Sequence, residues 1–139
     1  HHGGAVAAVA LDEAGQVYLV RQWRHAAGCA LLEIPAGTLG RDEPPEDCVR
    51  RELAEEIGQV PGQIEWLSSM YVAPGYATEV IHLYLASDLR PEQRPADEDE
   101  NLHVVLMRLE EALALCRSGE IRDGKSVAGL FLAAERLRR

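Results

Sequence analysis

The stretch Gly37–Gln59, GTLGRDEPPEDCVRRELAEEIGQ, decides the fold of this chain, because it combines a helical pattern with a dense group of acidic residues. A helix advances about 3.6 residues per turn, so Glu52 and Glu56 stand above one another on one face, with Glu55 beside them. Like charges at this spacing repel, and a sequence selected only for helix stability would interleave lysines there. The pattern therefore indicates a cation among the carboxylates. Magnesium and similar hard divalent ions bind such oxygens and reach their substrates through phosphate groups.

The same stretch predicts the limits and the buried face of the helix. The pair Pro44-Pro45 suits a helix entry, and Gly58 suits its end. Apolar residues recur every four positions on the face opposite much of the acidic cluster, and they are Val49, Leu53 and Ile57. We expect this face to pack on a core while Glu52 and Glu56 point outward.

The spacing of these residues resembles the Nudix box, the signature of hydrolases that cleave a nucleoside diphosphate linked to another moiety. Five residues separate Gly37 from Glu43, and seven more precede the run Arg51–Gly58, RELAEEIG. Every fixed position of the pattern is filled. The one departure is Gln59, where the family usually has an aliphatic residue, and we expect Val60 to take its packing role. The alternative is a solvated acidic helix face, the commoner fate of a charge run.

The composition indicates one globular domain across residues 1–139, which is long enough to bury a core. A net charge of -9 disfavours nucleic acid as a partner, because nucleic-acid binding depends on Lys and Arg. No run approaches the roughly 20 apolar residues of a membrane span. Three scattered cysteines, Cys29, Cys48 and Cys116, predict reduced thiols and a cytoplasmic protein. The chain enters an apolar run directly after His1-His2-Gly3-Gly4, so we expect an N-terminal segment to be missing.

The rest of the sequence alternates strand and helix patterns without a linker or repeat. Strands are predicted at Ala5–Leu11, Val17–Val20, Leu31–Ile34, Ile64–Val72, Val80–Leu85 and Leu102–Met107. Further helices are predicted at Leu109–Cys116 and Val127–Leu137. A mixed sheet flanked by helices is the simplest packing of this order. It matches the α/β/α sandwich that the Nudix resemblance implies.

The resemblance also implies a metal site and the residues around it. The expected ion is Mg²⁺, or else Mn²⁺ or another divalent ion. The implied ligands are Glu52, Glu55, Glu56 and the backbone carbonyl of Ala36, with Glu55 as a ligand or a bridging base. Arg51 is expected to orient the carboxylates through a two-point pair. Glu43 is expected to cap the loop without touching metal.

Two short motifs outside the box resemble the ADP-ribose pyrophosphatase branch of the family. They are Glu33–Gly37, EIPAG, and Pro74 in Ala-Pro-Gly-Tyr, fifteen residues beyond Gln59. The segment 97–102 and the pattern after it also fit, so the resemblance covers nearly the whole chain. It implies metal-dependent hydrolysis of ADP-ribose to AMP and ribose 5-phosphate, or hydrolysis of a similar nucleoside diphosphate sugar. Another nucleoside diphosphate derivative, such as a dinucleoside polyphosphate or coenzyme A, is the alternative substrate.

The catalytic base is expected in the acidic loop that precedes the last predicted strand. By resemblance the best-matched position is Glu98, with Glu100 second, while Glu55 in the box remains a third candidate. Such a carboxylate accepts a proton from the attacking water. A solvated acidic loop without a catalytic role is the alternative.

Substrate contacts are expected on both sides of the box. Arg24 is the phosphate-facing cation that the resemblance implies, and Gly75, Tyr76 and Glu79 belong to the predicted substrate loop. Glu79 suits hydrogen bonds from ribose hydroxyls. Trp23 or Tyr76 suits stacking on adenine, because aromatic faces bind nucleobases. Each of these residues has packing as its alternative role.

Two rival motifs are weaker. The segment Gly119–Ser126 has the spacing of a phosphate-binding P-loop, but a P-loop follows a strand, and here a helix is predicted before it. Asp97, Asp99 and Asn101 mimic the start of a calcium loop, but Leu102 stands where that loop requires glycine.

A rival function is a Nudix-like sensor that binds a nucleotide without cleaving it. Lost acidic residues in the box would be its mark, and none is lost. Catalysis is therefore the stronger interpretation. The family also implies a homodimer in which an N-terminal segment completes the neighbouring site.

Overall fold

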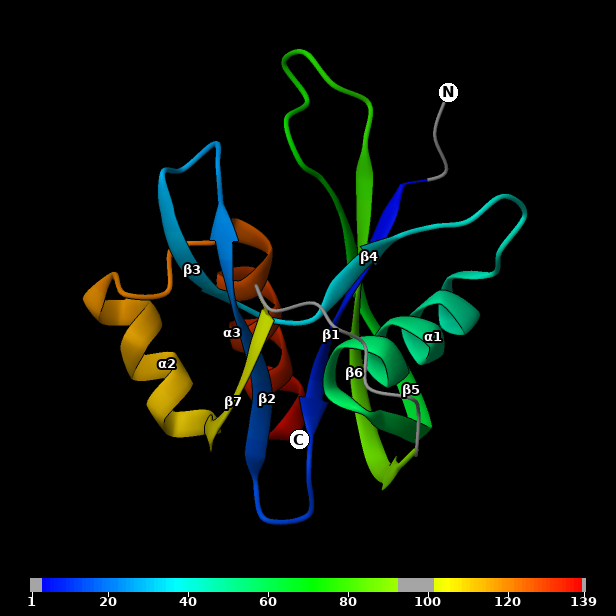
Figure 1. Ribbon diagram of the computed structural model, residues 1–139, viewed down its shortest axis with the longest axis vertical. Helices are drawn as coiled ribbons and strands as arrows, with labels where there is room; N and C mark the ends of the chain where they lie inside the picture. Colours follow the sequence, from blue (N-terminus) through cyan, green and yellow to red (C-terminus); the bar gives the residue numbers. More distant parts are fainter. Residues whose placement is uncertain (1–3, 93–101, 139) are drawn as a thin grey trace.

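The structure is a computed structural model, and it describes residues 4–92 and 102–138 (Figure 1). Its strands are β1 (Ala5–Leu11), β2 (Gln16–Arg24), β3 (Cys29–Glu33), β4 (Ala36–Thr38), β5 (Gln59–Tyr71), β6 (Val80–Pro91) and β7 (Leu102–Arg108). Its helices are α1 (Pro45–Ile57), α2 (Leu109–Ser118) and α3 (Gly124–Leu137). Every predicted strand and helix is present. The short strand β4 is additional.

The strands form one mixed sheet around β1. Strand β1 is parallel to β6 and antiparallel to both β2 and β4, and β5 completes this side against β6. Beyond β1, β2 pairs with β3 and with β7, both antiparallel. The mixed sheet predicted from the sequence is confirmed.

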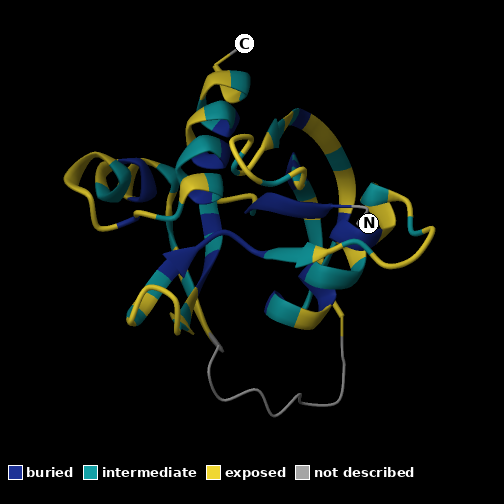
Figure 2. Cartoon of the chain, turned by 90° about the horizontal axis from the view of Figure 1, so that it is seen from above, coloured by how far each residue is buried: buried dark blue, intermediate teal, exposed yellow. Residues whose placement is uncertain are grey.

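Strand β1 is buried on both faces. Its side chains alternate between two core clusters, with Ala5, Ala7 and Val9 in one and Val6, Ala8 and Ala10 in the other. The first cluster includes Leu113 of α2 and Leu130 of α3, and the second includes Val49 and Leu53 of α1. Figure 1 shows α1 on one side of the molecule and α2 and α3 on the other. In Figure 2 the buried residues gather on the central strands, while loops and outer helix faces are exposed. This is the predicted α/β/α sandwich.

Helix α1 has the predicted limits and apolar face. It begins at Pro45, with Pro44 as its N-cap, and ends at Ile57. Its C-cap is Gly58, which has a φ of 67° and donates hydrogen bonds to the last-turn carbonyls. The predicted apolar residues Val49, Leu53 and Ile57 are all buried. The outward direction predicted for the acidic face is wrong, because only 14% of the Glu52 side chain is exposed. This side of the helix packs against β4, which the sequence pattern did not predict.

Several strands are longer than the patterns predicted. Strand β2 continues to Arg24, so that Arg24 is held in the sheet opposite Cys29 of β3. Strand β5 begins at Gln59, directly after the cap of α1. Gln59 and Val60 are both half-buried there. Pairing with neighbouring strands extends these segments beyond their alternating apolar residues.

Two further findings bear on the sequence predictions. Cys29, Cys48 and Cys116 are free thiols. No helix within residues 4–92 and 102–138 is long and apolar enough to cross a membrane.

Candidate functional site

Glu52 and Glu56 of α1 form a close carboxyl pair beside β4. Burial raises the pKa of the Glu56 carboxyl to about 8, and a hydrogen bond and the charge of Glu52 add to this rise. A hydrogen bond with the Ala36 backbone and the charge of Lys125 act in the opposite direction. Two half-buried carboxyls at one place favour a proton or a cation between them. The predicted neighbours Glu52, Glu56 and Ala36 are therefore brought together.

Gly37 makes room for this pair. A Cβ atom at position 37 would collide with the carboxylate of Glu52, so the backbone of β4 approaches α1 more closely than any side chain would permit. The first residue of the box is thus a glycine for a steric reason.

The donor set fits a hard divalent ion. The carboxylates of Glu52 and Glu56 and the Ala36 backbone offer oxygen, the ligand atom that Mg²⁺ prefers. In residues 4–92 and 102–138, no group of three His, Cys, Asp or Glu side chains is arranged to hold a metal. Magnesium does not require such a cage, because it keeps several waters and uses one or two carboxylates together with substrate phosphates.

Arg51 organises the loop around the carboxyl pair. Its Nε and Nη2 donate to the two oxygens of Glu43 at 2.9 Å each, and its Nη1 donates to Glu52 at 2.9 Å. Nη2 also reaches the carbonyl of Thr38 at 3.3 Å. The Glu43 oxygen that accepts Nη2, Oε1, also accepts the N–H of Gly40 at 2.8 Å. Glu43 therefore caps the loop through Arg51 and Gly40.

Glu55 approaches the same nitrogen of Arg51 as Glu52 does, but it is more exposed. Its carboxylate is 3.7 Å from Nη1 of Arg51, and 43% of its side chain is exposed. By contrast, 14% of the Glu52 side chain is exposed, and Glu52 packs against Gly37 of β4. Its predicted role as a ligand or bridging base remains a prediction.

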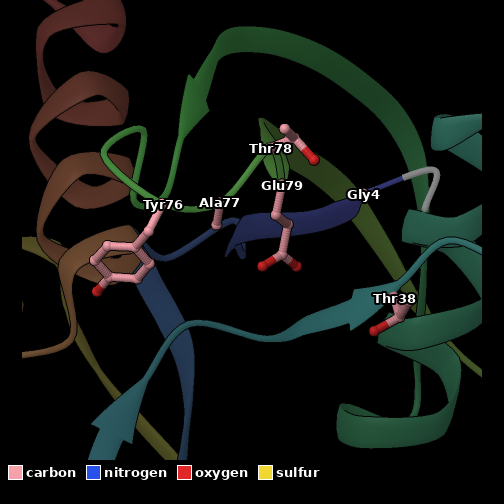
Figure 3. A pocket seen from close by; sticks show the side chains of 6 residues that line it. All are labelled: Gly4, Thr38, Tyr76, Ala77, Thr78 and Glu79. Carbon is pink, nitrogen blue, oxygen red and sulfur yellow. The ribbon is translucent and has the colours of Figure 1, made fainter. Parts of the chain in front are cut away.

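A pocket of about 600 Å³ lies between the β5–β6 loop, the start of β1 and the end of β4 (Figure 3). The residues that line it are Gly4, Thr38, Tyr76, Ala77, Thr78 and Glu79. The Glu79 carboxylate points into this space, and the Tyr76 ring lies at its edge with 91% of the residue exposed. Of the predicted substrate residues, the structure brings Tyr76 and Glu79 together. Gly75 lies outside the lining, and the exposed Trp23 donates from its ring to His25.

Strand β4 connects the pocket to the carboxyl pair. Along its three residues, Ala36 is hydrogen-bonded to Glu56, Gly37 packs on Glu52, and Thr38 lines the pocket. The sequence analysis missed Thr38. The box pattern gave no signal for it, because position 38 is free in that pattern.

Arg24 is held by a buried ion-pair network. Its Nε and Nη2 donate to the two oxygens of Glu33 at 2.7 and 2.8 Å, and Glu33 is 2% exposed. Glu33 also accepts the Lys125 ammonium at 2.9 Å, which in turn lies 2.8 Å from Asp123. The charge of Glu56 raises the pKa of Arg24 further, after its stronger hydrogen bond to Glu33. The network thus lies within electrostatic reach of the carboxyl pair.

The structure excludes a P-loop at residues 119–126. This segment connects α2 to α3, so no strand leads into it. Lys125 pairs with Glu33 and Asp123 instead of pointing into a loop of backbone N–H groups. The sequence analysis missed Glu33 and Lys125 as neighbours of the site, although each stood in a motif that drew attention to it.

The candidate bases Glu98 and Glu100 lie outside the described residues. The same holds for Asp97, Asp99 and Asn101 of the rejected calcium loop. Their roles stay predictions.

Comparison with known proteins identifies the family. The NUDIX domain family model matches residues 1–130. The chain is 39% identical over 127 residues to the ADP-ribose pyrophosphatase of Bacillus subtilis (strain 168), which covers 90% of this chain and 69% of that protein. It is 40% identical over 128 residues to the methanol dehydrogenase activator of Bacillus methanolicus, with 91% and 69% covered. It is 40% identical over 120 residues to the GDP-mannose pyrophosphatase of Citrobacter koseri, with 80% and 62% covered.

A solved structure supports the same assignment. The crystal structure of an ADP compounds hydrolase matches with a TM-score of 0.88 at 27% identity, covering 97% of this chain and 72% of that one. The chain belongs to the NUDIX domain family. The predicted family, fold and class of enzyme, a Nudix pyrophosphohydrolase, are confirmed. Nudix hydrolases generally use divalent metal ions.

Proposed function

We propose that this chain hydrolyses the pyrophosphate bond of ADP-ribose, or of a similar nucleoside diphosphate sugar, with the help of Mg²⁺. The observation that carries the proposal is the arrangement along β4. The carboxyl pair of Glu52 and Glu56 lies at one end, and the pocket containing Glu79 lies at the other. In a bound substrate, the metal and the pyrophosphate would lie at the carboxyl pair, and the sugar would lie in the pocket. Similarity to proteins named ADP-ribose pyrophosphatase and GDP-mannose pyrophosphatase supports the substrate class.

Glu52, Glu56 and the Ala36 carbonyl would hold the ion, with Glu55 as a further ligand or bridging base. When bound, a divalent ion neutralises phosphoryl oxygens and lowers the pKa of water so that a nucleophile exists near neutral pH. Mn²⁺ or another divalent ion fits the same oxygen donors. Arg51 keeps Glu52 in place through its pairs with Glu43 and Glu52.

The residues outside the box bind and orient the substrate. Arg24 faces phosphate as a guanidinium that is charged at any working pH, and its hydrogen bond to Glu33 raises its pKa further. Glu79 accepts hydrogen bonds from ribose hydroxyls in the pocket, and the exposed ring of Tyr76 offers a face to adenine. Gly75 gives the loop its turn beside Tyr76. These contacts hold the pyrophosphate bond, which is to be cleaved, next to the carboxyl pair.

In the chemical step, a water oxygen forms a bond to one phosphorus, and the bond from that phosphorus to the bridging oxygen breaks. ADP-ribose then gives AMP and ribose 5-phosphate. Glu98 accepts the proton of the attacking water, with Glu100 and Glu55 as the alternative bases. Arg51 takes no proton, because a guanidinium is already protonated at any working pH, and hydrogen bonding to Glu43 raises its pKa further.

The proposal also covers the domain organisation, oligomeric state, location and partners of the enzyme. Residues 1–139 form a single Nudix domain, which acts as a homodimer in the cytoplasm on small-molecule substrates. Neither nucleic acid nor membrane is its partner, in keeping with a net charge of -9.

A substrate panel tests the proposal. The protein is incubated with Mg²⁺ and with ADP-ribose, GDP-mannose, coenzyme A or a dinucleoside polyphosphate, and kcat/KM is measured for each. We expect a nucleoside diphosphate sugar to rank first. Preference for coenzyme A or the dinucleoside polyphosphate would contradict the substrate class but leave the metal site intact. Tight binding of ADP-ribose without products would instead indicate a sensor.

A further inference from the structure

Lys125 is the only lysine of the 139-residue chain, against thirteen arginines. It is also largely buried, with 13% of its side chain exposed. Its ammonium lies between two carboxylates, 2.9 Å from Glu33 and 2.8 Å from Asp123. A compact ammonium can serve two separate carboxylates, whereas a guanidinium fork favours two-point pairing with one. The choice of lysine at this position therefore fits its geometry.

Neutralisation of Glu33 alone does not explain Lys125. Arg24 already contacts both oxygens of the Glu33 carboxylate and balances its charge. The addition of Lys125 requires a second carboxylate, Asp123, to balance the ammonium. Burying the charges of Glu33, Lys125 and Asp123 in this way is a poor means of stabilising a fold, because desolvation offsets most of the attraction.

The network holds both the side chain of Glu33 and the backbone of Ile34. Asp123 accepts the hydroxyl of Ser126 at 2.5 Å, and the Ser126 oxygen accepts the buried N–H of Ile34 at 2.8 Å. The first turn of α3 thus holds both the side chain of Glu33 and the backbone of the next residue. That backbone leads directly into β4, which carries Ala36.

Chain connectivity places the network beside the carboxyl pair. Only Ile34 and Pro35 separate Glu33 from Ala36, whose backbone is hydrogen-bonded to Glu56. Of the Arg24 donors, Nε and Nη2 are committed to Glu33, and 43% of the side chain is exposed. The remaining edge of the Arg24 guanidinium is therefore held in one orientation by the Glu33 carboxylate, which Lys125 anchors.

We propose that Lys125 is a positioning residue for substrate phosphate. Anchored on Asp123, it holds Glu33 so that the free edge of Arg24 faces the phosphate groups. This role rests on the proposed function, because it assumes a phosphate beside Arg24. Lys125 acts on phosphate through Arg24, so its loss weakens phosphate binding more than it alters the chemistry at the carboxyl pair.

A double-mutant cycle on AMP binding tests this role. The dissociation constant for AMP is measured by calorimetry with Mg²⁺ for the unaltered protein, Lys125→Met, Arg24→Gln and the double variant. We expect each single variant to weaken AMP binding roughly tenfold, the effect of one charge-assisted hydrogen bond. The double variant should bind no more weakly than Arg24→Gln, because Lys125 acts on phosphate through Arg24. With ADP-ribose, Lys125→Met should raise KM and leave kcat within about threefold.

Additive losses in the double variant would overturn the role, as would unchanged AMP binding in Lys125→Met or no AMP binding by the unaltered protein. Arg136→Met is the matched control. Arg136 lies at the other end of α3, where it pairs with Glu65 of β5. If Lys125→Met does not fold, Asp123→Asn replaces it, since it removes the anchor of the ammonium. AMP is a product, so the cycle gives its answer without turnover. Absence of ADP-ribose hydrolysis contradicts the proposed function, whereas additive losses contradict only the role of Lys125.

Discussion

The guanidinium of Arg51 and the carboxylate of Glu43 form a two-point ion pair, with both N–O distances at 2.9 Å. Hydrogen bonding to Arg51, together with the Gly40 backbone, lowers the pKa of Glu43 to about 2. The pair leaves Nη1 of Arg51 directed at Glu52. One arginine therefore connects the loop that begins the box with the carboxylate that is proposed to bind metal.

Arg51→Lys should lower kcat/KM for ADP-ribose roughly 10- to 100-fold, the usual cost of losing a group that orients a metal ligand. Lysine keeps the charge but cannot form the two-point pair and contact Glu52 together. Steady-state kinetics over a range of Mg²⁺ concentrations measure the effect. Arg50→Lys is the control, because Arg50 pairs with Asp47 on the exposed side of α1. Equal activity of Arg51→Lys and the unaltered protein would contradict this role.

Gly37→Ala should lower turnover by about 100-fold in a folded protein. The added methyl would collide with the Glu52 carboxylate, and a displacement of about 1 Å at a catalytic group is enough for such a loss. Circular dichroism and a thermal melt check the fold. Gly124→Ala is the matched control, because the described residues leave open space around that position. Full activity of Gly37→Ala would show that Glu52 need not lie against β4.

Glu79→Gln should raise the KM for ADP-ribose roughly tenfold with a smaller change in kcat. The amide keeps the size of the side chain but loses charge-assisted acceptance from ribose hydroxyls. Glu13→Gln, in the β1–β2 turn, is the control for loss of one exposed carboxylate. A large fall in kcat with unchanged KM would assign Glu79 to the chemical step instead of to binding.

The Glu33 network should make stability sensitive to acid. Burial raises the pKa of Glu33, but hydrogen bonds from Arg24 and Lys125 outweigh burial, and the net pKa is lowered from 4.5. A carboxyl with a lowered pKa in the folded state stabilises the fold above its unfolded pKa, and this contribution is lost as the pH falls. The free energy of unfolding should therefore decrease from about pH 4.5 downward. Glu33→Gln should show a smaller decrease than the unaltered protein, and equal slopes would contradict the prediction.

The sequence predicted the part of the site that lies within one helix. Glu52 and Glu56 share a face because of helix geometry, and Gly37 and Arg51 have fixed spacings from them, so local patterns were sufficient. The predicted outward direction was wrong because β4, only three residues long, packs over this face. A strand that short has no alternation that a pattern can reveal.

The rest of the site depends on contacts between distant segments. Glu33 and Lys125 are 92 residues apart, and nothing in either local sequence indicates that they pair. Thr38 lines the pocket only because the loop before β6 folds over β4. Such contacts follow from sheet order and helix packing, which local periodicity does not determine.

Comparison of the unaltered protein with Glu56→Gln tests whether the carboxyl pair supports hydrolysis of ADP-ribose. Both are incubated with ADP-ribose, with Mg²⁺ or with a chelator, and AMP and ribose 5-phosphate are quantified beside a thermal melt. We predict equal amounts of the two products from the unaltered protein only when Mg²⁺ is present, and loss of most turnover in a folded Glu56→Gln variant. Near-normal turnover of Glu56→Gln, or tight binding of ADP-ribose by the unaltered protein without products, would contradict the account.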